Sequence, residues 1–283
     1  MRDDTAIFII THQRADKQLT LKMLESCGYS GRVYLVVDDM DGQIVEYRKR
    51  YGDKVLVFNK KRYAESVDTH INKFGMSSAL FARNACVDMA KDMRLKFYFV
   101  CDDDIRWTYF KDARTGKMVT TKITDMEGIL SGLVKFMENT SVHAVAFADN
   151  GAYIGGVNSE VRKGVKYTLT KFMLYRTSNP VEYESIIWED QASCYRDLGK
   201  GKIDFSIMFL SAATPPNEKA SGGCSEMYRQ STDYMNPFMV LLGRPDCVTI
   251  TPGKRGKFRM RTKRSALHPM ILNEMHRKKG GSE

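Results

Sequence analysis

A run of three aspartates, Asp102, Asp103 and Asp104, directly follows the most apolar segment of the sequence, residues 97–101. Adjacent carboxylates repel one another, whereas alternate residues of an extended segment point to the same side. Asp102 and Asp104 are therefore expected to face together and to bind a hard divalent cation such as Mg²⁺ or Mn²⁺. A solvated acidic turn is the alternative, but a triple aspartate is unusual directly after a buried strand.

Polar clusters also follow two other apolar segments. Residues 6–11 lead into a cluster that ends at Arg14, and residues 33–37 lead into Asp38 and Asp39. Short, β-branched apolar runs of this kind predict buried strands. Because ligands bind outside the carboxyl ends of the strands in an open α/β sheet, all three polar clusters are expected along one edge.

Strand and helix patterns alternate through the first hundred residues, which predicts an α/β fold with a parallel sheet and helices on both faces. The expected strands there are 6–11, 33–37, 55–58 and 97–101, and the expected helices are 18–27, one ending at 51, and 77–91. In the second half we expect a helix at 125–139, a glycine-rich loop at 150–158, a polar loop at 214–225, and strands at 144–148, 167–175, 238–242 and 258–263. The sequence has no internal repeat and no clear linker, so residues 1–283 are predicted to form one domain.

The composition is that of an ordinary globular protein. The 283 residues are 43% hydrophobic and 28% charged, which argues against disorder and low-complexity scaffolds. No apolar run approaches the ~18 residues needed to cross a bilayer, and the start of the chain lacks a secretory pattern, so a cytoplasmic protein is expected. The six cysteines include no CxxC pair, which favours buried thiols over a disulfide framework or a zinc site.

Positive charge is concentrated near the C-terminus. Residues 254–279 contain ten basic side chains and one acid, so the rest of the chain carries only +1 of the net charge of +10. A polyanionic partner, either nucleic acid or a phosphorylated substrate, is one interpretation, and a solubilising tail is the other. If the segment binds nucleic acid, the expected contacts come from Lys254, Arg255, Lys257, Arg259, Arg261, Lys263 and Arg264.

The polar clusters form an ordered set that resembles the GT-A glycosyltransferases. Its members are residues 8–14 (FIITHQR), 36–39 (VVDD), 82–84 (ARN) and 99–104 (FVCDDD). The two common nucleotide-binding loops, a Gly-Lys-Ser/Thr loop and a GxGxxG turn, are both absent. The resemblance implies a Rossmann-like GT-A fold, in which residues 1–105 bind the nucleotide sugar, 106–250 bind the acceptor and 251–283 form a basic extension. Cys101 stands where many members have their first aspartate, which leaves open whether Asp102 or Asp103 takes the inner role.

The resemblance also implies roles for individual residues. The metal would be bound by Asp102 and Asp104 with His268 as a late ligand, although a surface histidine capping the last helix is the alternative. The nucleotide sugar would be bound by Thr11, Arg14, Asp38, Asp39, Arg83, Asn84 and Asp103. Residues 187–190 (IWED) resemble the segment in which inverting members place the base, so Asp190 is the candidate base and Glu189 the alternative. Both acids also stand at the start of a predicted helix, where they would favour its dipole without any catalytic role.

The layout and the basic C-terminus most resemble the TET-associated glycosyltransferases, which add sugars to 5-hydroxymethylpyrimidines in DNA. This implies a metal-dependent inverting enzyme that uses a UDP-sugar, with UDP-glucose as the favoured donor, and acts on hydroxymethylated DNA in a phage-infected bacterial cytoplasm. One alternative is a GT-A enzyme that acts on a glycan, a lipid or a protein. Another is a nucleotidyltransferase or a nucleic-acid-binding protein.

Overall fold

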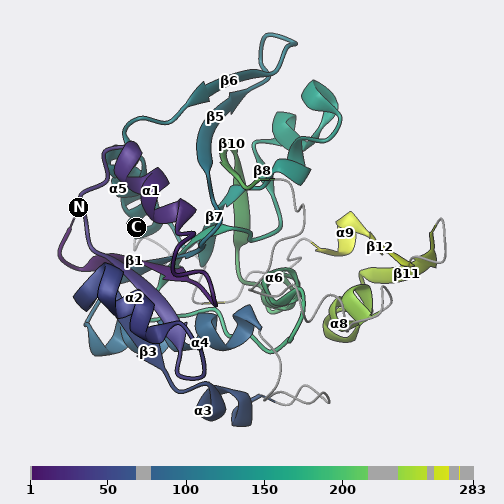
Figure 1. Ribbon diagram of the computed structural model, residues 1–283. Helices are drawn as coiled ribbons and strands as arrows, with labels where there is room; N and C mark the ends of the chain where they lie inside the picture. Colours follow the sequence, from purple (N-terminus) through teal and green to yellow (C-terminus); the bar gives the residue numbers. More distant parts are fainter. Residues whose placement is uncertain (1, 68–77, 216–234, 254–257, 268–273, 275–283) are drawn as a thin grey trace, which may run out of the picture.

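The computed structural model describes residues 2–67, 78–215, 235–253, 258–267 and 274, and it is built around a ten-stranded mixed sheet (Figure 1). The strands of this sheet are β1 (Thr5–Ile10), β2 (Val33–Asp38), β3 (Val55–Phe58), β4 (Phe97–Asp102), β5 (Trp107–Asp112), β6 (Val119–Lys122), β7 (Ala144–Ala148), β8 (Val165–Lys166), β9 (Phe172–Arg176) and β10 (Asp204–Ala213). Their order is β3-β2-β1-β4-β9-β7-β10-β5-β6, and β8 pairs with β10.

The first four strands in this order, β3, β2, β1 and β4, are all parallel neighbours. Their carboxyl ends therefore meet at one edge of the sheet, as the sequence predicted. Strand β9 then runs antiparallel between β4 and β7. In that register Phe172 lies opposite Cys101, so the residue before β9 is placed beside the start of the aspartate run.

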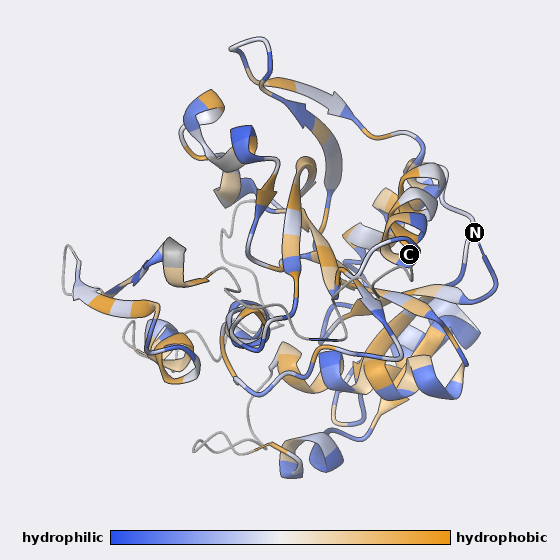
Figure 2. Cartoon of the chain, turned by 180° about the vertical axis from the view of Figure 1, so that it is seen from behind, coloured by the Kyte–Doolittle hydropathy of each residue, from blue (hydrophilic) through white to orange (hydrophobic). Residues whose placement is uncertain are grey.

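Helices cover both faces of the sheet. They are α1 (Leu19–Ser26), α2 (Ile44–Tyr51), α3 (Lys60–Glu65), α4 (Ala79–Asp92), α5 (Met126–Glu138) and α6 (Glu189–Gly199). Successive strand residues point to opposite faces, so Ala6 and Phe8 are buried with α4 and α6, whereas Ile7 and Ile9 are buried with α1 and α5. Figure 2 shows hydrophobic residues concentrated in the central strands, with hydrophilic residues on the outer surfaces of the helices.

A smaller unit near the C-terminus packs on the side of α6 (Figure 1). It consists of α8 (Met235–Gly243), the antiparallel pair β11 (Val248–Pro252) and β12 (Phe258–Thr262), and α9 (Arg264–Leu267). The hydroxyl groups of Tyr195 in α6 and Thr262 are hydrogen-bonded at 3.2 Å. Arg244, which follows α8, donates from Nη1 to the Tyr195 carbonyl at 2.6 Å. These contacts attach the hairpin β11–β12 to α6.

The predicted α/β class and most of the predicted elements are confirmed, but residues 238–242 were predicted as a strand and form part of α8 instead. A short apolar run does not distinguish a strand from a buried helical segment. The structure resolves the ambiguity, because Pro237, Val240 and Arg244 are buried at the three- and four-residue spacing of a helix face.

Three further predictions concern less regular segments. Strand β9 takes up only the last part of the predicted strand 167–175. The glycine-rich loop contains the short 3-10 turns η2 (Asn150–Tyr153) and η3 (Gly156–Asn158), and two others are η1 (Gly52–Lys54) and η4 (Glu160–Lys163). The predicted polar loop 214–225 lies outside the described residues from position 216 onward.

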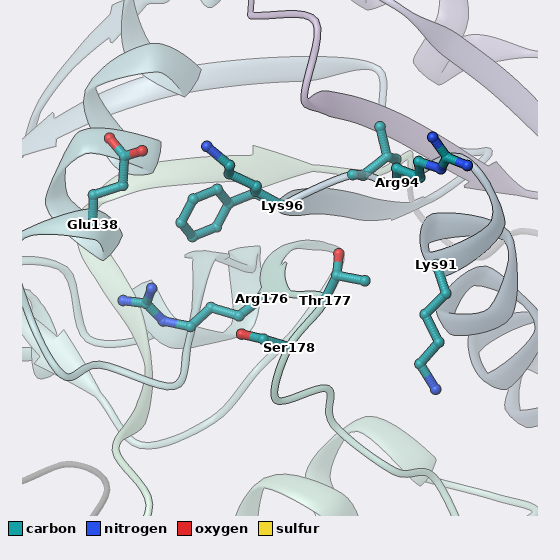
Figure 3. Close-up of a pocket in the computed structure, with 9 residues that line it drawn as sticks. Lys91, Arg94, Lys96, Glu138, Arg176, Thr177 and Ser178 are labelled. Atoms are coloured by element: carbon teal, nitrogen blue, oxygen red, sulfur yellow. The ribbon is translucent and has the colours of Figure 1, made fainter.

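A pocket lies at the edge of the sheet opposite to the aspartate run, where Phe97 of β4 is paired with Arg176 of β9. It is lined by Lys91, Arg94, Leu95, Lys96, Phe97, Glu138, Arg176, Thr177 and Ser178. Figure 3 shows basic side chains around the hydroxyl groups of Thr177 and Ser178. Because it lies at the amino end of β4, this pocket is separate from the polar strand ends. None of the helices in the described part of the chain is long and apolar enough to span a membrane.

Candidate active site

Asp103 is the inner acid of the aspartate run and connects the ends of β4 and β1. Thr11 donates from Oγ1 to Asp103 Oδ2 at 2.6 Å, and Arg14 Nη1 lies 2.8 Å from Asp103 Oδ1. Gln18 donates to Thr11 Oγ1 at 2.9 Å and so extends this buried network. Burial raises the pKa of Asp103 to about 6, although Arg14 opposes the shift. Asp103, Thr11 and Arg14 therefore shape the loop that follows β1.

Asp102 and Asp104 face a common ammonium group, as expected for alternate residues of an extended segment. Lys171 Nζ lies 3.2 Å from Asp102 Oδ2 and 4.0 Å from Asp104 Oδ1. Burial favours the neutral form of Asp102, but Lys171 and Arg83 outweigh it and lower the pKa of this carboxyl. Burial, assisted by the neighbouring Asp102, raises the pKa of Asp104. The Oδ1 atom of Asp104 is buried without a hydrogen-bond partner.

Arg83, on α4, joins the aspartate run to the start of α6. Its side chain is only 3% exposed, and its guanidinium donates from Nη2 to Asp102 Oδ1 at 3.0 Å and from Nε to Glu189 Oε1 at 2.9 Å. Burial opposes its charge, but the carboxylates of Asp102 and Glu189 outweigh that effect and raise the pKa of Arg83. The guanidinium of Arg83, bound to both carboxylates, fixes the distance between the end of β4 and the start of α6.

Glu189 and Asp190 are the first two residues of α6, as the sequence predicted. The preceding residue, Trp188, has φ 51°, in the left-handed region that non-glycine residues rarely adopt. Such a conformation costs free energy and persists where the surrounding structure enforces it. Here it turns the chain so that α6 begins beside Arg83 with both acids on the side of the aspartate run.

The environments of the two acids differ. Glu189 is buried and its carboxylate is bound by Arg83. Asp190 is partly exposed and accepts a hydrogen bond from the Gln191 amide at 2.7 Å. Burial, assisted by Glu189, raises the pKa of Asp190 to about 7. A carboxyl with such a pKa can exchange a proton near neutral pH, whereas the carboxylate of Glu189 is bound by Arg83.

Asp38 and Asp39, at the end of β2, lie in different settings. Asp38 is buried, and its Oδ2 accepts a hydrogen bond from His12 Nδ1 at 2.7 Å. Burial favours its neutral form, but His12 and Lys60 outweigh it and lower the pKa of Asp38. Asp39 is exposed, and its Oδ1 accepts from the Lys60 amide at 3.0 Å. Both residues lie at the predicted edge, and Asp39 is the more accessible to a ligand.

Asn84 has a structural partner for both ends of its side-chain amide. It donates from Nδ2 to the Tyr183 carbonyl at 2.9 Å and accepts from the Tyr183 amide at 3.1 Å. This pairing ties α4 to the segment that precedes α6. The role of Asn84 in binding the nucleotide sugar stays a prediction; its side-chain amide is paired with the Tyr183 backbone.

The basic C-terminal segment is only partly described. Arg259 and Arg261 are exposed on alternate positions of β12, so one face of that strand is basic, as the sequence predicted, and Lys263 just beyond it is exposed too. Four of the predicted residues lie outside the described residues: Lys254, Arg255, Lys257 and His268. The side chain of Arg264 lies outside them as well.

Sequence reasoning missed several polar residues at or near the site. Lys171 and the hydroxyl of Tyr47, which is hydrogen-bonded to Thr11 at 2.9 Å, come from segments whose pairing no local pattern reveals. It also gave no role to His143, which forms a buried cluster with Asp197 and Asp204 at the amino edge of β10. Among the described residues, that cluster and the group of His12, Asp38 and Asp41 are the sets of three or more His, Cys, Asp or Glu residues whose ligand atoms lie close enough together to bind a metal.

Residues 5–213 match the family model described as TET-Associated Glycosyltransferase. The match covers well over half of the chain and includes the polar strand ends, Arg83 and the start of α6. The protein is therefore a glycosyltransferase, as its strand-end motifs predicted. Within that class, the chain belongs to the TET-associated glycosyltransferase family. The basic hairpin β11–β12 lies beyond the matched region. A comparison with curated protein sequences gives no significant match.

Comparison with solved structures finds more distant likeness. Residues 1–349 of TarS from S. aureus align with a TM-score of 0.42 and 15% identity over 74% of this chain and 60% of that one, so the chain spans about three fifths of this relative. Glucosyl-3-phosphoglycerate synthase from Mycobacterium tuberculosis, in complex with Mg²⁺ and UDP, aligns with a TM-score of 0.47 and 8% identity over 91% of this chain and 86% of that one. GalNAc-T7 with UDP, GalNAc and Mn²⁺ aligns with a TM-score of 0.42 and 10% identity over 74% of this chain and 43% of that one.

Proposed function

We propose that this glycosyltransferase transfers a sugar from a UDP-sugar, with UDP-glucose as the favoured donor, to the hydroxymethyl group of a modified pyrimidine in DNA. The observation that carries the proposal is the continuous chain of contacts from Asp102 through Arg83 to Glu189, with Asp190 beside it. It joins a site for the donor diphosphate to a base for the acceptor. Such a reaction belongs in the cytoplasm of a phage-infected bacterium, where nucleotide sugars and replicating DNA are both present.

The side chains at the end of β4 fit a hard divalent cation. Asp102 and Asp104 offer carboxylate oxygens, which are the ligands that Mg²⁺ and Mn²⁺ prefer. The Oδ1 atom of Asp104 is buried without a hydrogen-bond partner, and a cation would satisfy it. A bound cation would neutralise charge on the leaving diphosphate. We therefore propose a metal-dependent reaction, with His268 as a further ligand.

The protein's own side chains can perform the rest of the transfer. The Asp190 carboxylate takes the proton of the hydroxymethyl group while the oxygen of that hydroxymethyl group bonds to the anomeric carbon of the sugar. The bond from that carbon to the diphosphate oxygen breaks in the same step, and the diphosphate leaves with the electron pair. Direct displacement inverts the anomeric configuration. Arg14, whose guanidinium lies at the end of β1, is placed to assist the phosphates, and exposed Asp39 to bind the nucleoside.

The hairpin β11–β12 supports a nucleic-acid acceptor. Its exposed Arg259 and Arg261 carry charge that suits phosphates, and the hairpin is attached through Thr262 to α6. Because α6 also carries Asp190, the same element links the basic surface to the candidate base. Phosphate contacts position DNA without reading sequence, so recognition of the modified base falls to the pocket near Asp190.

The direct test is a panel of UDP-sugars incubated with DNA that contains hydroxymethylated, methylated or unmodified pyrimidines, with divalent cation present. We expect one sugar to be transferred to the hydroxymethylated DNA alone, and mass spectrometry of the digested nucleosides measures the product. Sugar transfer to a glycan, lipid or protein but to none of the DNAs would overturn the proposed acceptor and leave the glycosyltransferase class standing.

Replacing Arg259, Arg261 and Lys263 together with serine is expected to raise the apparent KM for DNA and to flatten its dependence on salt. Binding releases counterions at each phosphate contact, so fewer are released when contacts are lost. The magnitude of the slope of log affinity against log salt should therefore fall by about 0.9 per lost contact. Hydrolysis of the donor in the absence of DNA should not change. A triple variant that binds DNA as tightly as the wild type would identify the segment as a solubilising tail.

A further inference from the structure

Lys171 is placed beside the aspartate run by the register of the sheet. Strand β9 pairs antiparallel with β4, and Phe172 lies opposite Cys101. The next residues outward are Lys171 and Asp102, and the Asp102 amide donates to the Lys171 carbonyl at 3.2 Å. The pairing of these two strands therefore fixes the lysine against the first aspartate, although the two residues are far apart in the chain.

The backbone of Lys171 is strained. Its φ is 61°, in the left-handed region that glycine adopts readily and lysine rarely does. A strained residue of this kind is more common at functional sites than elsewhere. The turn before β9 would form more easily with glycine at this position. The presence of a lysine there therefore points to a role for its charged side chain.

The ammonium of Lys171 uses the oxygen atoms that a cation would need. Asp102 Oδ1 is bound by Arg83, and Asp102 Oδ2 by Lys171 at 3.2 Å. Asp104 Oδ1 lies 4.0 Å from the same ammonium, beyond hydrogen-bond range, and has no other partner. A divalent cation shared by Asp102 and Asp104 would compete with these basic side chains for the carboxylate oxygens and be repelled by their charge, so its binding favours the withdrawal of one of them.

Lys171 is the side chain that can withdraw. Its side chain is 30% exposed, whereas that of Arg83 is 3% exposed and is also bound to Glu189. An ammonium on a flexible stem that turns outward loses its ion pair with Asp102 and the longer one with Asp104, but it regains water. The buried guanidinium of Arg83 would lose two close partners without that compensation.

We propose that Lys171 is a resident counter-ion of Asp102 and Asp104, which a divalent cation must displace in order to bind. Lys171 thereby keeps the two carboxylates together before the metal arrives and sets the metal affinity of the site. The inference rests on the proposed function only in that it concerns the same cation site, and it makes no use of the sugar donor or of DNA.

The test is calorimetric titration of Mn²⁺ into the metal-free protein. We expect Lys171→Met and Lys171→Gly each to bind Mn²⁺ about tenfold or more tightly than the wild type, because a competing positive charge is lost a few ångströms from the metal. Lys171→Gly also relieves the backbone strain, so a folding defect cannot explain both results. The rise in Tm caused by Mn²⁺ should be larger in both variants than in the wild type.

The control variant is Lys122→Met, which removes the same charge from the exposed strand β6 and should bind Mn²⁺ as the wild type does. Lys171→Arg keeps the positive charge and should not bind more tightly. The proposal is overturned if either Lys171→Met or Lys171→Gly binds Mn²⁺ no more tightly than the wild type, or if Lys122→Met gains as much. Because only protein and Mn²⁺ are present, these outcomes are distinct from a failure to transfer sugar to DNA.

Discussion

Asp190→Asn is expected to reduce kcat by about 10²-fold or more while leaving the KM for the donor nearly unchanged, because a base acts mainly in the transition state. The variant should fold well. The pKa of Asp190 is raised to about 7 from the 3.8 of the unfolded chain, so this group lowers stability progressively as the pH rises from 3.8 to about 7 and by a constant amount above that, and a neutral amide removes the cost. Steady-state kinetics with donor and acceptor varied in turn, together with a melting curve, give both quantities.

Glu189→Gln is the informative comparison, because it changes the neighbouring acid that Arg83 binds. We expect it to lower the rate because Arg83 loses a partner, and to move the rising limb of the pH profile to lower pH, because the charge of Glu189 helps to raise the pKa of Asp190. An Asp190→Asn variant that turns over at the wild-type rate, beside a Glu189→Gln variant that does not, would transfer the role of base to Glu189.

The pH dependence of the wild-type rate should reveal the same group. A carboxyl accepts a proton only when it is ionised, so kcat is expected to rise tenfold per pH unit below the pKa of about 7 and to level off above it. The Asp190→Asn variant should lose this limb. A wild-type profile that is flat from pH 5 to 8 would mean that no group of this pKa limits the reaction.

The polar edge could be predicted from the sequence because it depends on local patterns. Residues 97–101 are apolar throughout and stop at Asp102, and parallel strands bring their carboxyl ends to one edge. The start of α6 at Glu189 was equally predictable from the acids that open it. Each of these features is specified within a few residues of the chain.

The contacts that connect these features could not be predicted in the same way. The ion pair of Arg83 with Glu189 joins α4 to α6, and that of Lys171 with Asp102 depends on the antiparallel register of β9. Nothing near Lys171 in the sequence distinguishes it from other lysines. Strand β10 was missed for a related reason: the buried Ser206 and Ser211 interrupt its apolar pattern, and the partner of the Ser206 hydroxyl is the carbonyl of Thr168, which is distant in the chain.

Asp102→Asn and Asp104→Asn are each expected to abolish sugar transfer, and removal of divalent cations with EDTA should do the same to the wild type. The two variants differ in what else they disturb. Asp102 also binds the buried Arg83, so its loss weakens the contact with α6 and is expected to lower stability. The ion pair of Asp104 with Lys171 is long, at 4.0 Å, so Asp104→Asn should leave the melting temperature close to that of the wild type.

Asp104→Asn is therefore the decisive variant for the cation site, and Asp53→Asn, a change of the same charge at an exposed residue of η1, is its control. Transfer measured with and without EDTA separates a metal requirement from a folding defect, because the folded Asp104→Asn protein should be inactive under both conditions while Asp53→Asn should lose activity only in EDTA. Full activity of the wild type and of Asp104→Asn in EDTA would remove the cation from the reaction. In that case the ammonium of Lys171, which lies 3.2 Å from Asp102, would be one of the positive charges left to assist the diphosphate, with Arg83 and Arg14.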